Sequence, residues 1–292
     1  MIDVDADEVV PAKYDVSAMP TLVITDAEGN ELAKSVGAPF SDPEGAIKWF
    51  DEIGAKIDAF AGLQTKWDDS KHADAAIGEK FAEAASALGK AKQAIEVYNV
   101  LIELAGEDKA KAGALHILVA KMLLEESNLD GASEHAETAN KLLPEEGDAR
   151  IDLDMLRAQI LMWSGDSAGA RKLCEKHYEA LLKAADPRAM DLADTYLGTT
   201  ESDDEQVIAK TGRDMYLKLA EVFVKHERVW ELKVYAAYYG LSCNQEEAAV
   251  KELKEVIEKG KGDWVKIAKN VLEGHEKKEA DKDGDEDSEE ED

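Results

Sequence analysis

Three segments of this sequence share one spacing, and they decide most of the fold: LGKAKQAIEVY at residues 88–98, SNLDGASEHA at 127–136 and SGDSAGARKLC at 164–174. Corresponding alanines stand at intervals of 38 residues: Ala94, Ala132 and Ala170. A turn-forming residue precedes each alanine by five positions: Gly89, Ser127 and Gly165. A fixed period of this length predicts repeated structural units that stack on one another.

The composition around these segments favours helix over most of the chain. Of 292 residues 45% are hydrophobic and 6% aromatic. Alanine, leucine, glutamate and lysine dominate, and all four have high helix propensity. The β-branched residues and prolines typical of strands and turns gather in roughly the first forty positions. We therefore predict two architectures, a short mixed α/β part followed by a long helical part.

The charge excludes some classes of partner. With 64 acidic and 35 basic residues the formal net charge is −29. Such a surface repels phosphate backbones and anionic membranes, so neither nucleic acid nor membrane is expected as a partner. It favours solubility and basic partners. The chain has no long apolar run and begins without a recognisable signal peptide, so we expect a cytoplasmic protein.

No catalytic group stands out. The two cysteines, Cys174 and Cys243, are 69 positions apart and form no CxxC or zinc-binding pattern, so we interpret both as packed apolar side chains. The six histidines form no metal-binding motif, and nucleotide-binding loops and nucleophile motifs are missing. We expect no catalytic residue, metal or cofactor in this chain.

The first sixty residues predict the order strand, helix, strand, strand, helix. Residues 2–5 alternate as a strand does, and residues 7–15 can form a short helix. The run Leu22–Ile24 predicts a strand buried on both faces, and a turn at 26–30 leads into a second strand at 31–36. A helix opens at Pro43. Its expected buried stripe is Ile47, Phe50, Ile53, Ile57 and Phe60.

This order resembles the second half of a bacterial-type thioredoxin domain. The similarity lies in Lys13–Val16, Met19-Pro20-Thr21, Gly29 and Gly37, which match the family's conserved pattern from its third strand to its last. The resemblance implies a partial thioredoxin-like domain at residues 1–62. It also implies that Pro20 is cis and that Met19, Pro20 and Thr21 form a loop that presents backbone groups to an extended peptide.

The thioredoxin family carries its CxxC upstream of the point where this sequence begins. Three explanations follow. The natural protein extends further upstream, or the half-domain docks on its own helices, or another chain completes it. A half-domain that pairs with a second copy would form a dimer.

The helical part resembles the tetratricopeptide repeat, a helical hairpin in which a short turn precedes a second helix. The resemblance covers residues 71–186 and places Gly89, Ser127 and Gly165 in the turns. It places the three alanines of the period, and the next buried positions Tyr98, Ala136 and Cys174, between the two helices. Pro144 matches the proline that closes a repeat.

Beyond residue 186 the period is lost. Helices near 207–225, 228–242, 245–259 and 263–274 continue or cap the array, after an acidic linker or helix cap at 199–206. Trp230, Tyr235, Tyr238 and Tyr239 are interpreted as the core of these capping helices, with a peptide-binding groove as the alternative. Residues 275–292 are strongly acidic and are expected to form a disordered tail.

These patterns lead to three functional hypotheses. The first is a non-catalytic interaction module that binds other proteins or extended peptide segments. The second is a thiol–disulfide oxidoreductase whose CxxC lies upstream of this sequence. The third and weaker one is a holdase-like chaperone.

Overall fold

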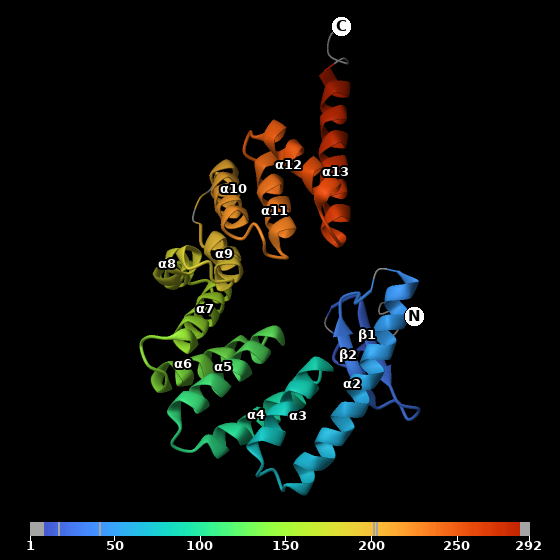
Figure 1. Cartoon of the computed structure of the whole chain (residues 1–292), viewed down its shortest axis with the longest axis vertical. Coiled ribbons are helices and arrows are strands. Elements are labelled where there is room, and N and C mark those ends of the chain that lie inside the picture. The colour runs from blue at the N-terminus through green and yellow to red at the C-terminus, as the bar shows by residue number, and fades with distance from the viewer. Residues whose placement is uncertain (1–8, 17, 41, 201, 203, 287–292) are drawn as a thin grey trace. The chain divides into compact units, whose positions relative to one another are not determined.

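The computed structural model describes residues 9–16, 18–40, 42–200, 202 and 204–286, and Figure 1 shows the chain with β1, β2 and α2 to α13 labelled. The first elements are α1 (Val9–Lys13), β1 (Thr21–Thr25), β2 (Glu31–Val36), α2 (Pro43–Asp69), α3 (Ala75–Ala87) and α4 (Ala91–Ala105). They are followed by α5 (Lys109–Glu125), α6 (Leu129–Leu142), α7 (Asp148–Trp163), α8 (Ser167–Lys183) and α9 (Arg188–Gly198). The last are α10 (Glu205–Val222), α11 (Val229–Leu241), α12 (Glu246–Lys259) and α13 (Asp263–Glu286).

The chain divides into two compact units, Met1–Leu156 and Arg157–Asp292, and the division falls inside α7. The first unit holds the β-hairpin and the helices up to α6. The second holds the helices from α8 onward. Each unit is described by itself.

The strands form an antiparallel hairpin in which Thr21 faces Val36 and Ile24 faces Ala33. A register shift follows Ile24, next to the turn. Gly29 has a φ of 79°, which glycine adopts without strain, so the predicted turn and both predicted strands are confirmed. The strand predicted at residues 2–5 lies outside the described residues.

The β1 run is less buried than predicted. Leu22, Val23 and Ile24 are all half-buried, so the expectation of a strand covered on both faces is wrong. The physical reason is the width of the sheet. Over the described residues it contains β1 and β2 alone, and two strands leave an edge and part of each face exposed.

The helix predicted after the hairpin is confirmed as α2, with Pro43 as its first residue. Asp42 caps it, since a side-chain oxygen of Asp42 accepts a hydrogen bond from the Gly45 amide at 2.7 Å. Its buried stripe is only partly as predicted. Ile53 and Phe60 are buried and Ile57 is half-buried, whereas Ile47 and Phe50 are exposed. The hairpin strands are too short to cover the first turns of a 27-residue helix.

One core joins the hairpin to the first helices. It contains Ala33 from β2, Phe60 and Trp67 from α2, and Phe81 and Leu101 from α3 and α4. The sequence placed a boundary between residues 62 and 71, but that stretch lies mostly within α2, whose last turns pack against α3. The hairpin is therefore built onto the helical array through a shared core.

The repeat pattern is confirmed at its buried positions. Ala94, Ala132 and Ala170 have no exposed surface, and the predicted positions Tyr98, Ala136 and Cys174 are buried as well. The predicted turn residues all have a positive φ: Gly89 at 73°, Ser127 at 59° and Gly165 at 84°. The helical pairs α3/α4, α5/α6 and α7/α8 thus follow the predicted hairpin order, and α6 ends one residue before Leu143-Pro144.

The second unit contains a further copy of the same turn that the period does not reveal. Asn244 has a φ of 58°, and Ala249, five residues later, has no exposed surface. This turn joins α11 to α12 as Gly89 joins α3 to α4. The predicted helices after residue 206 correspond to α10, α11, α12 and α13. Asp204 caps α10 within the acidic segment that was interpreted as a linker or cap.

The C-terminal segment differs from the sequence-based expectation over residues 275–286. There α13 continues, where we expected a disordered tail. Glutamate, lysine and alanine dominate the first part of this stretch, and their helix propensity lets a helix that begins at Asp263 continue. The remainder of the expected tail, residues 287–292, lies outside the described residues.

Candidate functional site

The loop predicted to bind peptide stands at the start of β1. Met19 is 71% exposed, and the Met19–Pro20 peptide bond is cis. The Thr21 hydroxyl donates to the Ala18 carbonyl at 2.5 Å, and the Gly37 amide donates to the Pro20 carbonyl at 2.8 Å. The three predicted residues are therefore held at the end of the hairpin, with the Met19 side chain directed to solvent.

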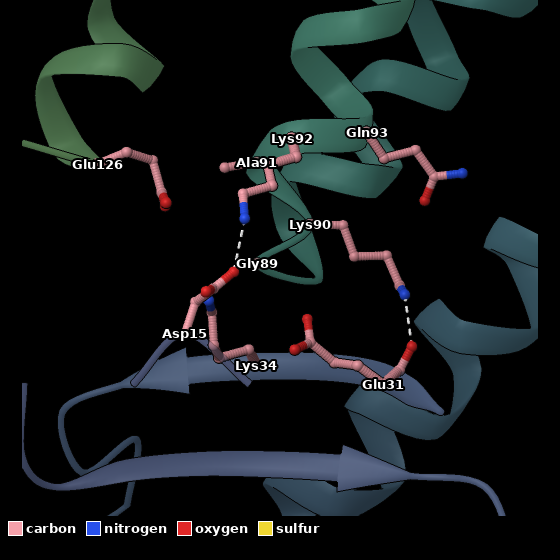
Figure 2. Close-up of a pocket in the computed structure, with 9 residues that line it drawn as sticks. All are labelled: Asp15, Glu31, Lys34, Gly89, Lys90, Ala91, Lys92, Gln93 and Glu126. Atoms are coloured by element: carbon pink, nitrogen blue, oxygen red, sulfur yellow. Dashed lines mark hydrogen bonds and ion pairs between the residues drawn. The ribbon is translucent and has the colours of Figure 1, made fainter. Parts of the chain in front are cut away.

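A pocket of about 210 Å³ lies where the hairpin meets the turn between α3 and α4 (Figure 2). Lys90 and Lys92 reach it from the start of α4, and Glu31 and Lys34 from β2. The Lys92 Nζ atom lies 2.6 Å from a carboxylate oxygen of Asp15, and Lys90 Nζ donates to the Glu31 carbonyl at 2.6 Å. Lys90 is therefore already engaged by the hairpin, and Lys92 by Asp15, which precedes the hairpin.

Backbone contacts also join the hairpin to the turn between α3 and α4. The Lys34 amide donates to the Leu88 carbonyl at 2.8 Å, which ties β2 to the αα-turn. At the next residue, Gly89, a Cβ atom would stand 2.2 Å from the Lys34 carbonyl oxygen. Only glycine fits this contact, so we assign this pocket to docking of the hairpin.

A second candidate site is a group of aromatic side chains on α10, α11 and α13. Tyr216 stacks on two tyrosines of α11, at 5.1 Å between ring centroids for Tyr235 and 5.8 Å for Tyr239. The edge of Tyr238 meets Tyr239, and the Trp264 ring of α13 meets Tyr235. We call these five residues the tyrosine surface. The sequence interpretation as a core of capping helices is wrong for Tyr235 and Tyr238, which are 38% and 53% exposed.

The buried base of the tyrosine surface is fixed by polar contacts. Tyr216 is buried, and its hydroxyl is hydrogen-bonded to the Asp194 carboxylate of α9. Burial and this carboxylate together raise the pKa of Tyr216, so its hydroxyl stays protonated. Gly212 makes room for the Tyr239 ring, because a Cβ atom there would stand 2.9 Å from the ring.

Arg213, next to this glycine, ties three helices together. Its side chain is buried and makes a bidentate ion pair with Glu252 of α12 at 2.9 and 3.0 Å. It also donates to the Ala236 carbonyl of α11 at 2.8 Å and to the Gln245 side chain at 2.8 Å. A charge removed from water in this way needs all of these partners. Arg213 therefore holds α10, α11 and α12 in the positions that stack the tyrosines.

Arg228, whose charge acts on Tyr235, is paired with acids. It lies 2.6 Å from Asp191 and 2.7 Å from Glu231. With this cation neutralised and Asp194 hydrogen-bonded to Tyr216, the tyrosine surface offers aromatic faces in an acidic setting.

The two cysteines do not resemble an active dithiol. Cys174 is fully buried, and burial raises the pKa of its thiol to about 11. A thiol of this kind is protonated at neutral pH and is a poor nucleophile. Cys243, which is half-buried, lies after the end of α11 beside the Gly240 carbonyl. Over the described residues no group of three or more histidine, cysteine or acidic side chains could hold a metal ion.

The sequence reasoning missed Tyr216, Arg213 and Asp194. Tyr216 and Arg213 lie on a helix that was expected, but their roles depend on which residues of α11 and α12 pack against them. One signal in the sequence could have revealed the hairpin formed by α11 and α12. The five-residue spacing from Asn244 to Ala249 repeats that of the three aligned segments, and it would have placed α11 and α12 as a pair.

Comparison with known proteins supports the helical architecture. No protein-family model matches the chain. No curated protein sequence matches it either. Among solved structures, a tetratricopeptide repeat protein from Parabacteroides merdae ATCC 43184 is similar at a TM-score of 0.50 and 15% identity. The similarity covers 77% of this chain and 79% of that one.

Two further structures are similar at a TM-score of 0.39. YrrB, described as a TPR protein with an unusual peptide-binding site, is 15% identical, over 71% of this chain and 97% of its own. The assembly chaperone of RpL4, Acl4, is 14% identical, over 73% of this chain and 99% of its own. The likeness to the Parabacteroides protein defines the class of fold: the helical part is an array of tetratricopeptide-like hairpins. Among the described residues, no helix is long and apolar enough to cross a membrane.

Proposed function

We propose that this protein is a non-catalytic interaction module that binds extended segments of other proteins through the tyrosine surface. One observation carries the proposal: Tyr235 and Tyr238 are exposed although they belong to an ordered group of rings built on buried Tyr216. Tyrosines held in this way supply contact area at little cost in side-chain entropy, which is why they are enriched at binding hot spots. Stacked helical hairpins commonly bind protein segments.

The expected partner is a basic segment that also carries apolar side chains. The protein has a net charge of −29, and Arg228, whose charge acts on Tyr235, is neutralised by Asp191 and Glu231. A lysine or arginine of the partner can lie over an exposed tyrosine ring, which contributes about 0.5–1 kcal/mol at an exposed site. The electrostatic field of the net negative charge attracts the same basic residues of the partner over a longer range.

The test begins with a photo-reactive amino acid at position 238 of the full chain, used to cross-link and identify the bound segment. Binding of that segment as a synthetic peptide is then measured by calorimetry. We expect Tyr238→Ala to weaken binding by about 10–30-fold, because truncation of an aromatic hot-spot residue typically costs about 2 kcal/mol. Tyr238→Phe retains the ring and most of the affinity.

The matched control is Trp163→Ala, which removes an exposed aromatic ring outside the tyrosine surface. This variant should bind as the wild type does. Equal losses in both variants, or none in Tyr238→Ala, would contradict the proposal. Equal binding of unrelated unfolded proteins, abolished by Tyr238→Ala, would instead favour the holdase hypothesis.

We also propose that residues 1–62 correspond to part of a thioredoxin-like domain and that Met19, Pro20 and Thr21 form a second peptide contact. The β1–β2 hairpin followed by α2 and the exposure of Met19 support this. The buried Cys174 gives no support to a thiol–disulfide oxidoreductase. A photo-reactive residue at position 19 tests the contact: a cross-linked polypeptide segment would support it, and the absence of any cross-linked polypeptide would contradict it.

A further inference from the structure

Two histidines of the first unit, His116 of α5 and His135 of α6, bring metal-ligating atoms close together. Their Nδ1 atoms lie 3.0 Å apart, although the residues are 19 positions apart in the sequence. The ring centroids are 5.0 Å apart, and the ring planes are inclined by 53°. A metal motif on one helix places its ligands about one turn apart, so the sequence does not reveal a pair that two helices supply.

The two helices hold the rings in place and leave them open to water. Ala120, about one turn after His116, and Ala132, about one turn before His135, have no exposed surface, so both helices are anchored close to the rings. Both histidines are half-buried, and part of each residue therefore stays in contact with solvent. Ligands that are already positioned lose little side-chain entropy when an ion binds.

Both rings are available as neutral ligands at neutral pH. Burial lowers the pKa of both histidines, and His135 lowers the pKa of His116 further. A neutral imidazole has one nitrogen lone pair for a metal ion, whereas a protonated ring has none. In the free protein one Nδ1 donates its hydrogen to the other. When an ion binds, this hydrogen is replaced by exchange with water at Nε2 of the same ring, so both Nδ1 lone pairs become free.

The separation of the two nitrogens favours one kind of coordination. Imidazole nitrogens lie about 2.0–2.1 Å from such an ion, so two of them are about 2.9 Å apart at a right angle and about 3.3 Å apart at a tetrahedral angle. The observed 3.0 Å is nearer the right angle, which is typical of the square-planar coordination of Cu(II) and Ni(II). Of the divalent first-row metals, Cu(II) binds nitrogen ligands most tightly.

We propose that His116 and His135 bind one Cu(II) ion through their Nδ1 atoms and that this ion links α5 to α6. Among the described residues no third histidine, cysteine or acid completes a metal-binding group, so water takes the other positions of the ion. Glu134, whose charge acts on His135, and the net charge of −29 attract a cation. Because the two rings meet only in the folded hairpin, the ion stabilises the folded state.

The test adds one equivalent of Cu(II) to the full, metal-free chain at about pH 7.5, where both rings are neutral. We expect calorimetry to give one ion per chain and electron paramagnetic resonance to show splitting by two imidazole nitrogens. The resonance spectrum counts the ligands in the wild type and so needs no variant. Zn(II), which prefers tetrahedral coordination, should bind at least about ten-fold more weakly.

His116→Asn and His135→Asn should each weaken Cu(II) binding at least about ten-fold, because one coordinate bond remains in place of two. Circular dichroism checks that both variants are folded. The matched control is His72→Asn. His72 lies in the same unit, 3.1 Å from a carboxylate oxygen of Asp68, and is the place where a competing imidazole–carboxylate site could form. This variant should bind Cu(II) as the wild type does and keep the two-nitrogen splitting.

Three results would overturn the proposal: splitting by fewer than two nitrogens, equal Cu(II) binding by His116→Asn, or equal binding of Zn(II). If the pair is a hydrogen bond between helices and nothing more, both variants lower the Tm but bind Cu(II) as the wild type does. Tyr238→Ala, in the other unit, should leave Cu(II) binding unchanged. A failure of this site is therefore seen separately from a failure of the tyrosine surface.

Discussion

At the scale of single residues, position 89 shows how a distant backbone restricts a turn. Gly89 adopts a φ of 73°, and its α-carbon faces the Lys34 carbonyl so closely that a Cβ atom would stand 2.2 Å away. Gly165 occupies the same place in a later hairpin, with a φ of 84°, but a Cβ there would meet nothing within 4 Å. The two glycines therefore share a conformation and differ in their surroundings.

This difference allows a matched experiment. Gly165→Ala should lower the free energy of unfolding by about 1 kcal/mol, the cost of a left-handed conformation for an L-residue. Gly89→Ala bears the same cost and must also displace β2, so we expect a loss of about 2–4 kcal/mol. Urea unfolding of the full chain measures both. Equal losses in the free energy of unfolding would show that the close contact with the Lys34 carbonyl does not restrict position 89.

The same pair of glycines shows what the sequence can predict. The five-residue spacing to Ala94 and Ala170 predicted both turns, because a turn conformation is a local property. The contact between Gly89 and Lys34 was not predictable, since the two residues lie 55 positions apart and no local pattern records it. Tyr178 is a similar case: its helix was expected, but its buried hydroxyl, which has no hydrogen-bond partner among the described residues, results from the packing of α8 against α9.

At the scale of elements, α5 and α6 are joined by a histidine pair. The Nδ1 atoms of His116 and His135 lie 3.0 Å apart, which requires that one ring donates and the other accepts. Burial lowers the pKa of both rings, and for His116 the neighbouring histidine lowers it further. Both observations favour the neutral forms in the folded protein.

These shifts predict how stability depends on pH. A histidine whose pKa is lower in the folded state binds more protons when unfolded. The stability it supports is complete above the unfolded pKa of about 6.5 and is lost as the pH falls below that value. We therefore expect the Tm to fall between pH 7.5 and pH 5.

The double variant His116→Asn/His135→Asn tests this. Its Tm should change less over the same pH range than that of the wild type, because neither asparagine titrates. The range from pH 7.5 to 8.5 serves as reference, since the pair is neutral there in both states. A double variant with the same pH dependence as the wild type would show that the pair does not determine it.

Element prediction succeeded where a period or an early helical proline marked the sequence. Pro43 placed the start of α2, and the spaced alanines placed the helical hairpins. It failed where packing against other elements decides whether a side chain is exposed. Ile47 and Phe50 have helical spacing and were expected to be buried, but the short strands of the hairpin do not cover them. Burial depends on the length of the neighbouring strands, which helical periodicity does not contain.

At the scale of the whole molecule, net charge is the dominant quantity. The chain carries 64 acidic side chains against 35 basic ones, and many of the basic side chains already form ion pairs within the protein. Self-repulsion of this kind destabilises the folded chain and is screened by salt. At an ionic strength of about 1 M the Debye length falls to about 3 Å, so most of this repulsion disappears.

We therefore expect the Tm of the full chain to rise as sodium chloride is increased from low ionic strength to about 0.5 M. Calorimetry measures it, and potassium chloride at the same ionic strength should give the same rise. Binding of the basic segment at the tyrosine surface should weaken over the same range. A Tm that is constant or falls with salt would show that self-repulsion does not limit stability.

The net negative charge has a second role, which concerns the half-buried strand β1. Thr-Leu-Val-Ile-Thr is an uncharged, β-branched segment, and among the described residues β2 is the strand that pairs with it. Its other edge can template a strand from another molecule, as in the growth of fibrils. Mutual repulsion between copies opposes this association. Near the isoelectric point of about 4.5 that protection vanishes, so we expect self-association through this edge to be strongest there.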